Sequence, residues 1–314
     1  MTGKNATEVL AADAKGIAAA VQILLAGGIV SIPTETVYGL AARADDAAAV
    51  AQIYAAKGRP DFNPLIVHVA DTGQARTLAS WNDQAARLAA RFWPGPLTLV
   101  LPQQDRGALA PAVTAGLPTV ALRNPAHPIM RAVLASAQVP LAAPSANRSG
   151  AVSPTRCAHV LASLEGRIDA VIDGGICAEG LESTIVALRG DGGWQMLRPG
   201  PVGEAQIAAL LGPPEAIHSS AIEAPGQLAS HYSPGKRVRL DATARAEDEF
   251  LIGFGSVDGD CTLSGSGDLV EAAARLYDCL HQAAIAPQSR VAVAPVPDEG
   301  VGAAINDRLR RSAA

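Results

Sequence analysis

The chain has 314 residues, of which 49% are hydrophobic, 18% charged and 4% aromatic, and its formal net charge is −5 at pH 7. This composition supports a substantial core and excludes a chain that is disordered throughout. The negative net charge argues against a protein whose main task is to coat nucleic acid, although it allows a local basic pocket for phosphates.

The N-terminus and the apolar runs predict the cellular compartment, and the cysteines and histidines predict whether the protein binds a metal. No apolar run reaches the length of about 18 residues that a membrane span requires, and the N-terminus lacks the features of a secretory signal. We therefore expect a cytoplasmic protein. Paired cysteines and histidine spacings typical of metal ligands are both missing, so we expect no metal site, and free thiols rather than disulfides at Cys157, Cys177, Cys261 and Cys279.

Strands and helices alternate along the first 210 residues or so, which predicts an α/β domain. Helices are expected at residues 11–26, 45–57, 83–93, 128–137, 155–164 and 203–211. Strands are expected at residues 29–32, 65–69, 97–101, 119–122, 141–143, 170–172, 184–188 and 194–197. Because the last two strands follow each other directly, the sheet should be mixed rather than wholly parallel.

A second, smaller α/β unit follows a proline-rich linker. Its strands are expected at residues 238–240, 250–254 and 291–294, and its helices at residues 268–284 and 303–311. We therefore predict a catalytic domain over residues 1–211, a linker over 212–235 and a small domain over 236–314.

Four polar segments interrupt the apolar pattern, and the first of them directly follows a predicted strand, where open α/β sheets place their ligands. The first is Pro33-Thr-Glu-Thr-Val-Tyr-Gly-Leu40, and the second, Lys57-Gly-Arg-Pro60, holds two cations in a stiff loop suited to phosphate or carboxylate oxygens. Taken alone, the first could be an ordinary turn, and the second could be cations placed favourably at a helix C-terminus.

Two further polar segments lie at residues 145–155 and 182–200. The first is rich in hydroxyl groups, which suits a nucleotide, but it could equally be a turn that ends in a helix N-cap at Ser153. The second combines Glu182-Ser-Thr184 with Leu197-Arg-Pro-Gly200, while Arg123 ends another strand. The phosphate-loop, dinucleotide and hydrolase-elbow motifs are all missing. The residues alone therefore predict an α/β enzyme with an anion pocket, and nothing narrower.

In combination, these motifs resemble the threonylcarbamoyl-AMP synthase (YrdC-like) family. The resemblance rests on Pro33–Leu40, Lys57–Pro60 with Asn63-Pro-Leu65, Pro94-Gly-Pro96, Pro144-Ser-Ala-Asn147 and Glu182–Thr184, all in the family's order and spacing. It covers about residues 12–205, and His231-Tyr-Ser-Pro234 is similar to the longer, two-domain form. One departure is Leu228-Ala-Ser230, where relatives often carry basic residues.

The resemblance implies a YrdC-like twisted mixed sheet with flanking helices and a Rossmann-like small domain. It also implies the reaction, in which L-threonine, bicarbonate and ATP give threonylcarbamoyl-AMP and pyrophosphate, with magnesium on the polyphosphate. The product would feed threonylcarbamoyladenosine modification of tRNA through a downstream tRNA threonylcarbamoyl-transferase complex. Direct contact with tRNA is left open.

The resemblance also implies the roles of individual residues. The positions that match threonine-binding ones are Thr36, His68, Arg123, Ser145 and Ser183. The positions that match ATP-binding ones are Arg59, Asn63, Thr119, Ala143, Asn147, Ser153, Arg198 and Tyr232. Lys57 and Arg59 are expected to neutralise charge during catalysis, because attack of a carbamate on a phosphate brings two anions together.

The linker that carries Tyr232 is hypothesised to close over the nucleotide as a lid and to keep water from the adenylate. Two other functions remain as alternatives. One is a module that binds structured RNA, against which the acidic composition counts. The other is a carbamoyl-transfer maturation factor, whose relatives carry zinc-finger segments that this sequence lacks.

Overall fold

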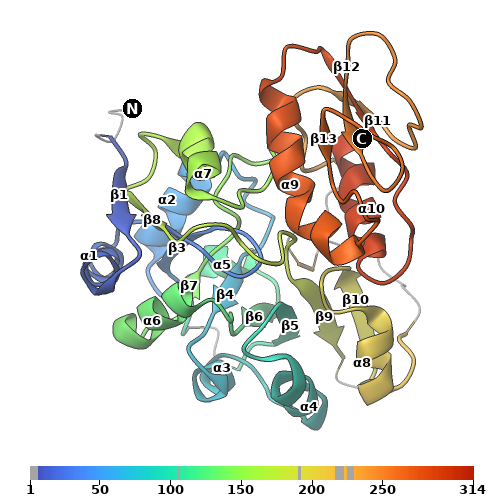
Figure 1. Ribbon diagram of the computed structural model, residues 1–314. Helices are drawn as coiled ribbons and strands as arrows, with labels where there is room; N and C mark the ends of the chain where they lie inside the picture. Colours follow the sequence, from blue (N-terminus) through green and yellow to red (C-terminus); the bar gives the residue numbers. More distant parts are fainter. Residues whose placement is uncertain (1–5, 105–106, 190–191, 216–222, 225–229) are drawn as a thin grey trace.

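The computed structural model describes residues 6–104, 107–189, 192–215, 223–224 and 230–314 (Figure 1). The larger of its two sheets has the strand order β1-β8-β2-β3-β7-β4-β6-β5-β9-β10 and is mixed, with parallel and antiparallel neighbours. Its strands are β1 (Glu8–Ala11), β2 (Val30–Ile32), β3 (Gly39–Arg43), β4 (Ile66–His68), β5 (Leu97–Pro102), β6 (Thr119–Arg123), β7 (Leu141–Ala142), β8 (Ala170–Asp173), β9 (Thr184–Leu188) and β10 (Trp194–Arg198).

Helices pack on both faces of this sheet, and the period-2 alternation of the strands sends successive side chains into different hydrophobic clusters. In β3, Leu40 and Ala42 point into one cluster while Ala41 points into the other. The cluster of Ala41 is completed by α1 (Ala14–Leu25) and α6 (Pro128–Ala137). The other is completed by α2 (Ala47–Lys57), α3 (Thr72–Leu78), α4 (Asp83–Phe92), α5 (Pro111–Thr114), α7 (Cys157–Leu164) and α8 (Glu204–Leu211).

The smaller sheet is parallel throughout and has the order β11-β14-β12-β13. Its strands are β11 (Arg237–Arg239), β12 (Glu249–Gly253), β13 (Cys261–Thr262) and β14 (Arg290–Val293), and its helices are α9 (Leu269–Ile285) and α10 (Gly302–Ala313). The predicted fold class, a twisted mixed sheet with flanking helices and a small Rossmann-like unit, is confirmed.

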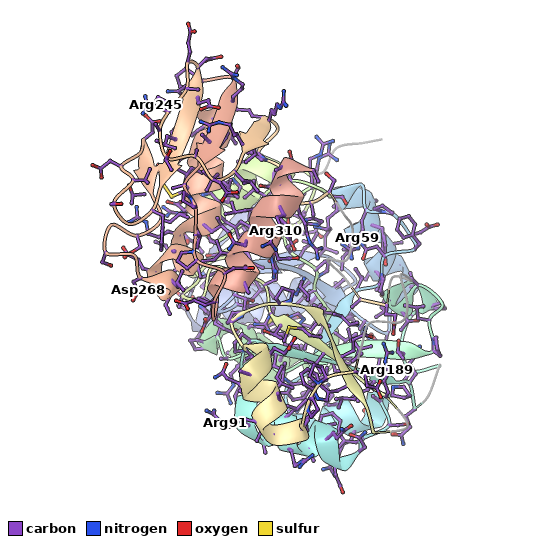
Figure 2. All side chains as sticks on the ribbon, turned by 90° about the vertical axis from the view of Figure 1, so that its right-hand side faces the viewer. Arg59, Arg91, Arg189, Arg245, Asp268 and Arg310 are labelled. Atoms are coloured by element: carbon purple, nitrogen blue, oxygen red, sulfur yellow. A yellow bond between two sulfur atoms is a disulfide. The ribbon has the colours of Figure 1, made fainter. Side chains whose placement is uncertain are left out.

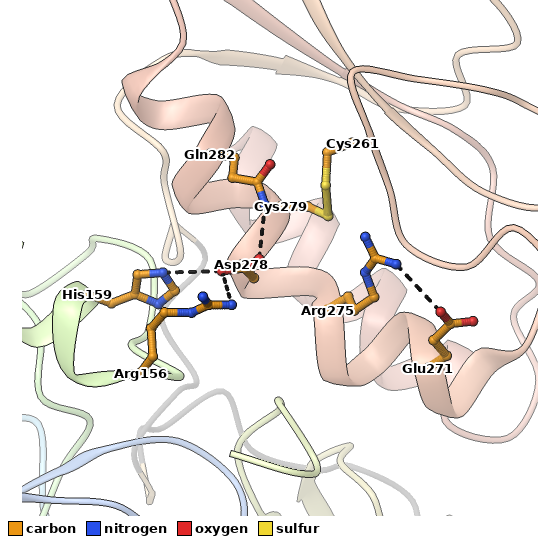
Figure 3. The surroundings of a disulfide bond; sticks show 8 residues. All are labelled: Arg156, His159, Cys261, Glu271, Arg275, Asp278, Cys279 and Gln282. Carbon is orange, nitrogen blue, oxygen red and sulfur yellow. Dashed lines mark hydrogen bonds and ion pairs between the residues drawn. A yellow bond between two sulfur atoms is a disulfide. The ribbon is translucent and has the colours of Figure 1, made fainter. Parts of the chain in front are cut away.

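The two units are packed against each other through shared apolar and polar contacts. Val37, Val152 and Leu181 of the larger unit belong to the hydrophobic cluster of the smaller one. At the edge of this contact Asp278 of α9 binds Arg156 (2.7 Å) and faces His159 of α7 (Figure 3). Because both kinds of contact join the units, α9 has a defined position relative to the larger sheet.

The expectation of free thiols is wrong for two of the four cysteines. Cys261 of β13 and Cys279 of α9 form a disulfide, whereas Cys157 and Cys177 are buried thiols (Figure 3). The two bonded residues are 18 positions apart in sequence, but the packing of α9 against β13 brings their Cα atoms to 6.0 Å. That distance lies within the usual range for a disulfide, and no sequence spacing motif announces it.

The predicted linker at residues 212–235 is described only in part, because residues 216–222 and 225–229 lie outside the described residues. The division into these three segments therefore stays a prediction. In the part of the chain that the structure describes, no helix has both the length and the apolar character needed to cross a bilayer.

Candidate functional site

A pocket opens where the polar segments of the larger unit meet the end of the linker. Four short stretches of chain form most of its wall, within residues 34–39, 143–145, 182–183 and 231–232. Arg59, His68, Arg123 and Arg198 add polar side chains from other positions. Segments that are far apart in sequence thus converge on one cavity, in which three guanidinium groups face the same space.

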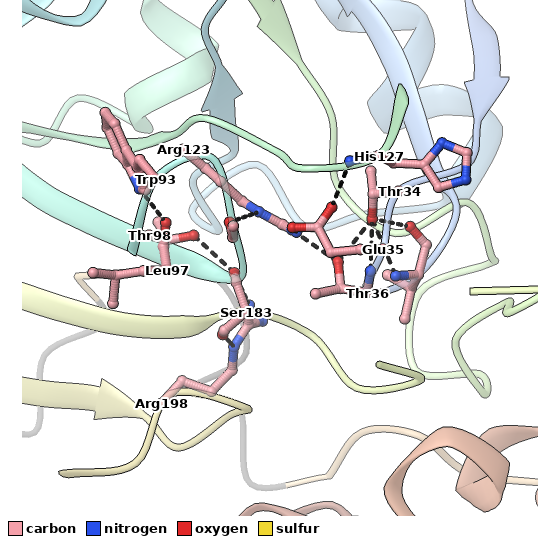
Figure 4. A network of polar contacts seen from close by, with 12 residues as sticks. Thr34, Glu35, Thr36, Trp93, Leu97, Thr98, Arg123, His127, Ser183 and Arg198 are labelled. Atoms are coloured by element: carbon pink, nitrogen blue, oxygen red, sulfur yellow. Dashed lines mark hydrogen bonds and ion pairs between the residues drawn. The ribbon is translucent and has the colours of Figure 1, made fainter. Parts of the chain in front are cut away.

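Arg123, at the end of β6, is held in place by the segment that follows β2 (Figure 4). Its Nη1 donates to Thr36 Oγ1 (2.8 Å), and its Nη2 forms an ion pair with Glu35 Oε1 (2.6 Å). Burial by itself would raise the pKa of Glu35, but the positive charge of Arg123 outweighs this and lowers it. The Glu35 carboxylate therefore stays ionised, and the Arg123 that it orients lines the pocket.

Ser183 and Arg198 form a second polar group in the wall (Figure 4). The Ser183 hydroxyl lies 2.7 Å from Thr98 Oγ1, and Arg198 Nη2 donates to it at 3.2 Å. Arg198 Nε donates to the Ser183 carbonyl (3.0 Å). Gly200 makes this arrangement possible, because a Cβ there would lie 2.5 Å from the Thr184 backbone nitrogen.

Lys57 is the last residue of α2 and Arg59 lies just beyond the helix, and the two cations make different contacts. Arg59 lines the pocket, and its Nε and Nη2 are fixed by the carbonyls of Asn63 (3.1 Å) and Pro64 (2.7 Å). Burial lowers the pKa of Arg59 to about 10. The Lys57 ammonium is instead turned away from the pocket wall and donates to the carbonyls of Ser145 and Asn147, both at 2.5 Å.

Among the described residues, neither Arg59 nor Arg198 forms an ion pair with a carboxylate. Burying a cation without a carboxylate partner costs free energy, and an anionic ligand that binds beside the cation would offset that cost. The pocket is therefore built to receive negative charge.

Two neutral histidines complete the wall. Burial lowers the pKa of both His68 and His231 to about 3, so their rings are uncharged near neutral pH. Their Nδ1 atoms are buried and have no hydrogen-bond partner among the described residues, as is also true of the side-chain oxygens of Asn63 and Asn147. Unsatisfied buried polar atoms at a cavity indicate places where a ligand or water completes the hydrogen bonding.

Most residues implied by the family resemblance meet in this pocket, but five do not line it. Those in the wall are Thr36, Arg59, His68, Arg123, Ala143, Ser145, Ser183, Arg198 and Tyr232. Lys57, Asn63 and Asn147 lie behind it, in or bonded to the two loops that present Arg59 and Ser145. Thr119 is at the opposite end of β6 from Arg123.

Ser153 also lies behind the wall, and the interpretation of it as a helix N-cap is wrong. Its hydroxyl donates to Glu182 Oε1 (2.5 Å), whereas α7 begins at Cys157 after the N-cap residue Arg156. The hydroxyl is thus used to hold a carboxylate of the pocket rather than a helix terminus.

Tyr232 brings the end of the linker into the pocket. Its side chain is buried, and its backbone has φ +64°, a left-handed conformation that is costly for a residue other than glycine. The flanking residues hold it in place, because the backbone N–H of His231 donates to the Arg311 carbonyl (3.1 Å) and that of Ser233 to the Gly150 carbonyl (2.8 Å). The linker end is therefore anchored to both units.

The sequence reasoning did not assign a role to Glu35, Glu182 or His231. Glu35 orients Arg123, and both Glu182 and His231 line the pocket. A signal was available for each, because each lies inside a motif that was already singled out, beside a residue with an assigned role. Within the described residues, no cluster of three or more His, Cys, Asp or Glu side chains is placed to hold a metal ion.

Two family models together match most of the chain. Residues 22–200 match the Sua5/YciO/YrdC model, described as "Telomere recombination", and residues 202–314 match the "Threonylcarbamoyl-AMP synthase, C-terminal domain" model. A threonylcarbamoyl-AMP synthase of Bacillus subtilis is 39% identical over 98% of this chain and 96% of its own. That of Pyrococcus abyssi is 38% identical over 91% of this chain and 90% of its own.

Solved structures give the same result. The crystal structure of P. abyssi Sua5 complexed with L-threonine covers 98% of both chains with a TM-score of 0.89 and 34% identity. E. coli YciO, with a TM-score of 0.55 and 23% identity over 64% of this chain, shares the fold of the larger unit. The resemblance seen in the motifs is thus confirmed over the whole length, and the chain belongs to the threonylcarbamoyl-AMP synthase family.

Proposed function

We propose that this pocket is where the chain, as a threonylcarbamoyl-AMP synthase, joins L-threonine, bicarbonate and ATP into threonylcarbamoyl-AMP and pyrophosphate. Water leaves when the threonine amine and bicarbonate form the carbamate. The observation that carries the proposal is the convergence of Arg59, Arg123 and Arg198 on one buried cavity. A carbamate, a carboxylate and a triphosphate together bring more negative charge than any single substrate. Cations fixed in advance can compensate this charge without reorganising during the reaction.

On this proposal, threonine occupies the side of the pocket formed by Thr36, Arg123 and Ser183. The Arg123 guanidinium would receive the carboxylate, and the hydroxyl groups and neutral His68 would bind the amine and hydroxyl. That the Pyrococcus neighbour was solved in complex with L-threonine supports threonine as a ligand of this chain. Ser145, at the turn after β7, would close the same side.

ATP would occupy the side formed by Arg59, Ala143, Arg198 and Tyr232, with the more distant residues shaping it. The bond to the leaving pyrophosphate breaks as a carbamate oxygen bonds to the α-phosphate, so no covalent protein intermediate is needed. Asn63, Thr119, Asn147 and Ser153 remain proposed contributors to the ATP site. We propose that Lys57 supports catalysis by holding the loop of Ser145 and Asn147.

Magnesium is proposed as a companion of ATP. The carboxylates nearest the pocket, Glu35 and Glu182, are both engaged in ion pairs with arginines, so this donor set does not fit a metal held by the protein itself. Magnesium commonly keeps its waters and binds substrate phosphates, which suits its arrival with the nucleotide.

The function is tested by measuring pyrophosphate release. Purified protein supplied with ATP, magnesium and bicarbonate should release pyrophosphate only when L-threonine is added, and threonylcarbamoyl-AMP should appear in equal amount by mass spectrometry. Leaving out magnesium should abolish the signal. Pyrophosphate release that does not depend on threonine would contradict the proposal.

We propose that the end of the linker acts as a lid over the adenylate. The buried position of Tyr232 and its anchoring on both units support this. A Tyr232→Ala variant should release pyrophosphate more slowly and lose more of its adenylate to hydrolysis, because water would reach the product. Tyr232→Phe keeps the ring and should retain more adenylate. Equal adenylate survival in the alanine variant and the wild type would rule the lid out.

The wider assignments are also proposals. Residues 1–211, 212–235 and 236–314 would be the catalytic domain, the linker and the small domain. The protein would work in the cytoplasm and pass its product to a tRNA threonylcarbamoyl-transferase complex.

A further inference from the structure

A fully buried carboxylate connects the small unit to the wall of the pocket. Glu182 lies directly before Ser183, and its Oε2 accepts hydrogen bonds from Tyr277 of α9 (2.7 Å) and Arg308 Nε of α10 (3.0 Å). Its Oε1 accepts from Ser153 (2.5 Å). Two of its three side-chain partners thus come from the small unit, although Glu182 itself lines the pocket.

Arg308 contacts three separate segments of the pocket wall. Besides Glu182, its Nη1 donates to the Pro199 carbonyl (2.7 Å), next to Arg198. Its guanidinium also lies over the ring of Tyr232, 5.6 Å from the centroid. The Arg308 side chain is 0% exposed, so its guanidinium binds protein groups and not solvent. Arg308 therefore holds Glu182, the Pro199 carbonyl and the Tyr232 ring in fixed positions relative to one another, around the part of the pocket proposed for ATP.

The backbone around Glu182 is fitted closely to the small unit. Gly180 has φ +66°, and a Cβ at that position would lie 2.5 Å from the Cα of Ala274 in α9. A side chain there would push the two segments apart. The close approach of chain to helix keeps Glu182 within reach of Tyr277 and Arg308.

The charge of Arg308 matters for Arg198. Burial alone would raise the pKa of Glu182, but the charges of Arg308 and Arg198 lower it to about 2, so the carboxylate is ionised. After Arg308, the guanidinium in the described part of the chain that most lowers the pKa of this carboxylate is that of Arg198. Arg198 would then be drawn toward Glu182 and away from an anion in the pocket.

We infer that Arg308 is a positioning residue for adenylate formation: by binding Glu182, the Pro199 carbonyl and the Tyr232 ring, it leaves Arg198 available to ATP. This role rests on the proposed function of the pocket. It also gives the small unit a role in the reaction, because Arg308, which positions groups of the pocket wall, belongs to α10 of the small unit.

The test compares Arg308→Met with a matched control. Arg308→Met should raise the KM for ATP by about 10- to 100-fold, the usual effect of removing a group that orients a binding residue. Arg310→Met, on the same helix but 61% exposed and paired with Asp298, should leave the KM unchanged (Figure 2). ATP affinity measured by calorimetry should fall in parallel.

A second variant separates positioning from folding. In E182Q/R308M the competing carboxylate charge is gone, so the KM for ATP should lie between those of Arg308→Met and the wild type. Should Arg308→Met fail to fold, this double variant carries the comparison, because it also removes the Glu182 charge that loses its Arg308 partner in the single variant. A KM for ATP within about 2-fold of wild type in folded Arg308→Met, or a double variant no better than the single one, overturns the inference.

The calorimetric measurement also separates this inference from the proposed function. It needs no turnover, so it reports ATP binding even if pyrophosphate release turns out not to depend on threonine. Loss of ATP affinity in Arg308→Met without threonine-dependent turnover in the wild type would support the positioning role and contradict the proposed reaction.

Discussion

An Arg59→Met variant should lose about 10²–10³-fold in kcat/KM for threonine-dependent pyrophosphate release, the effect of removing one donor fixed in advance toward developing charge. Arg59 faces the pocket, and two main-chain carbonyls already hold its guanidinium. It therefore needs no rearrangement when the phosphates arrive. Methionine keeps an unbranched apolar stem but is shorter and supplies neither the charge nor the donors.

Two further variants make this result specific. Arg59→Lys keeps the charge but loses the planar fork, so its kcat/KM should fall between those of Arg59→Met and the wild type. Arg91→Met removes an exposed arginine of α4 and should have no effect (Figure 2). If Arg59→Met folded normally and kept more than about a tenth of wild-type kcat/KM, Arg59 would not carry the charge neutralisation that we propose.

An Arg123→Met variant should raise the KM for threonine by about 10- to 150-fold, which corresponds to the ~1.5–3 kcal/mol that a hydrogen bond to a charged group contributes. The same change should lower the free energy of unfolding by about 3–5 kcal/mol, because it leaves the buried carboxylate of Glu35 without its partner. Chemical denaturation and threonine titration measure the two effects separately.

The double variant E35Q/R123M distinguishes binding from stability. Glutamine removes the unpaired charge, so the double variant should recover most of the lost unfolding free energy. The KM for threonine should stay high, because no guanidinium is restored. A double variant with normal KM for threonine would show that Arg123 serves the fold only.

The elements best predicted from sequence are those with strong apolar runs or clear ends. Helix α6 and strand β9 have the expected bounds, 128–137 and 184–188. Strand β1 was missed because three of its four residues are exposed, which leaves no alternation to detect. Strand β3 was missed because its small buried residues continue a polar motif that was interpreted as a loop.

Site residues could be predicted where they lie inside motifs shared with a known family. Ion pairs between residues far apart in sequence could not be predicted. Thr36 and Ser183 could be assigned because each stands inside a motif. Glu35 meets Arg123 across 88 positions, and Glu182 meets Arg308 across 126. Such pairs depend on how β2, β6 and α10 are placed in space, and a single sequence contains no local pattern that reports this.

Because of the disulfide, the presence or absence of a thiol reductant during purification is an experimental variable. Cys279 stands two residues after Tyr277 on α9, so the bond to Cys261 fixes the helix that contacts Glu182. Protein purified with a thiol reductant and protein purified without it are then two molecules with differently restrained helices. Kinetic constants of variants should be compared only between samples whose thiol content has been titrated and matched.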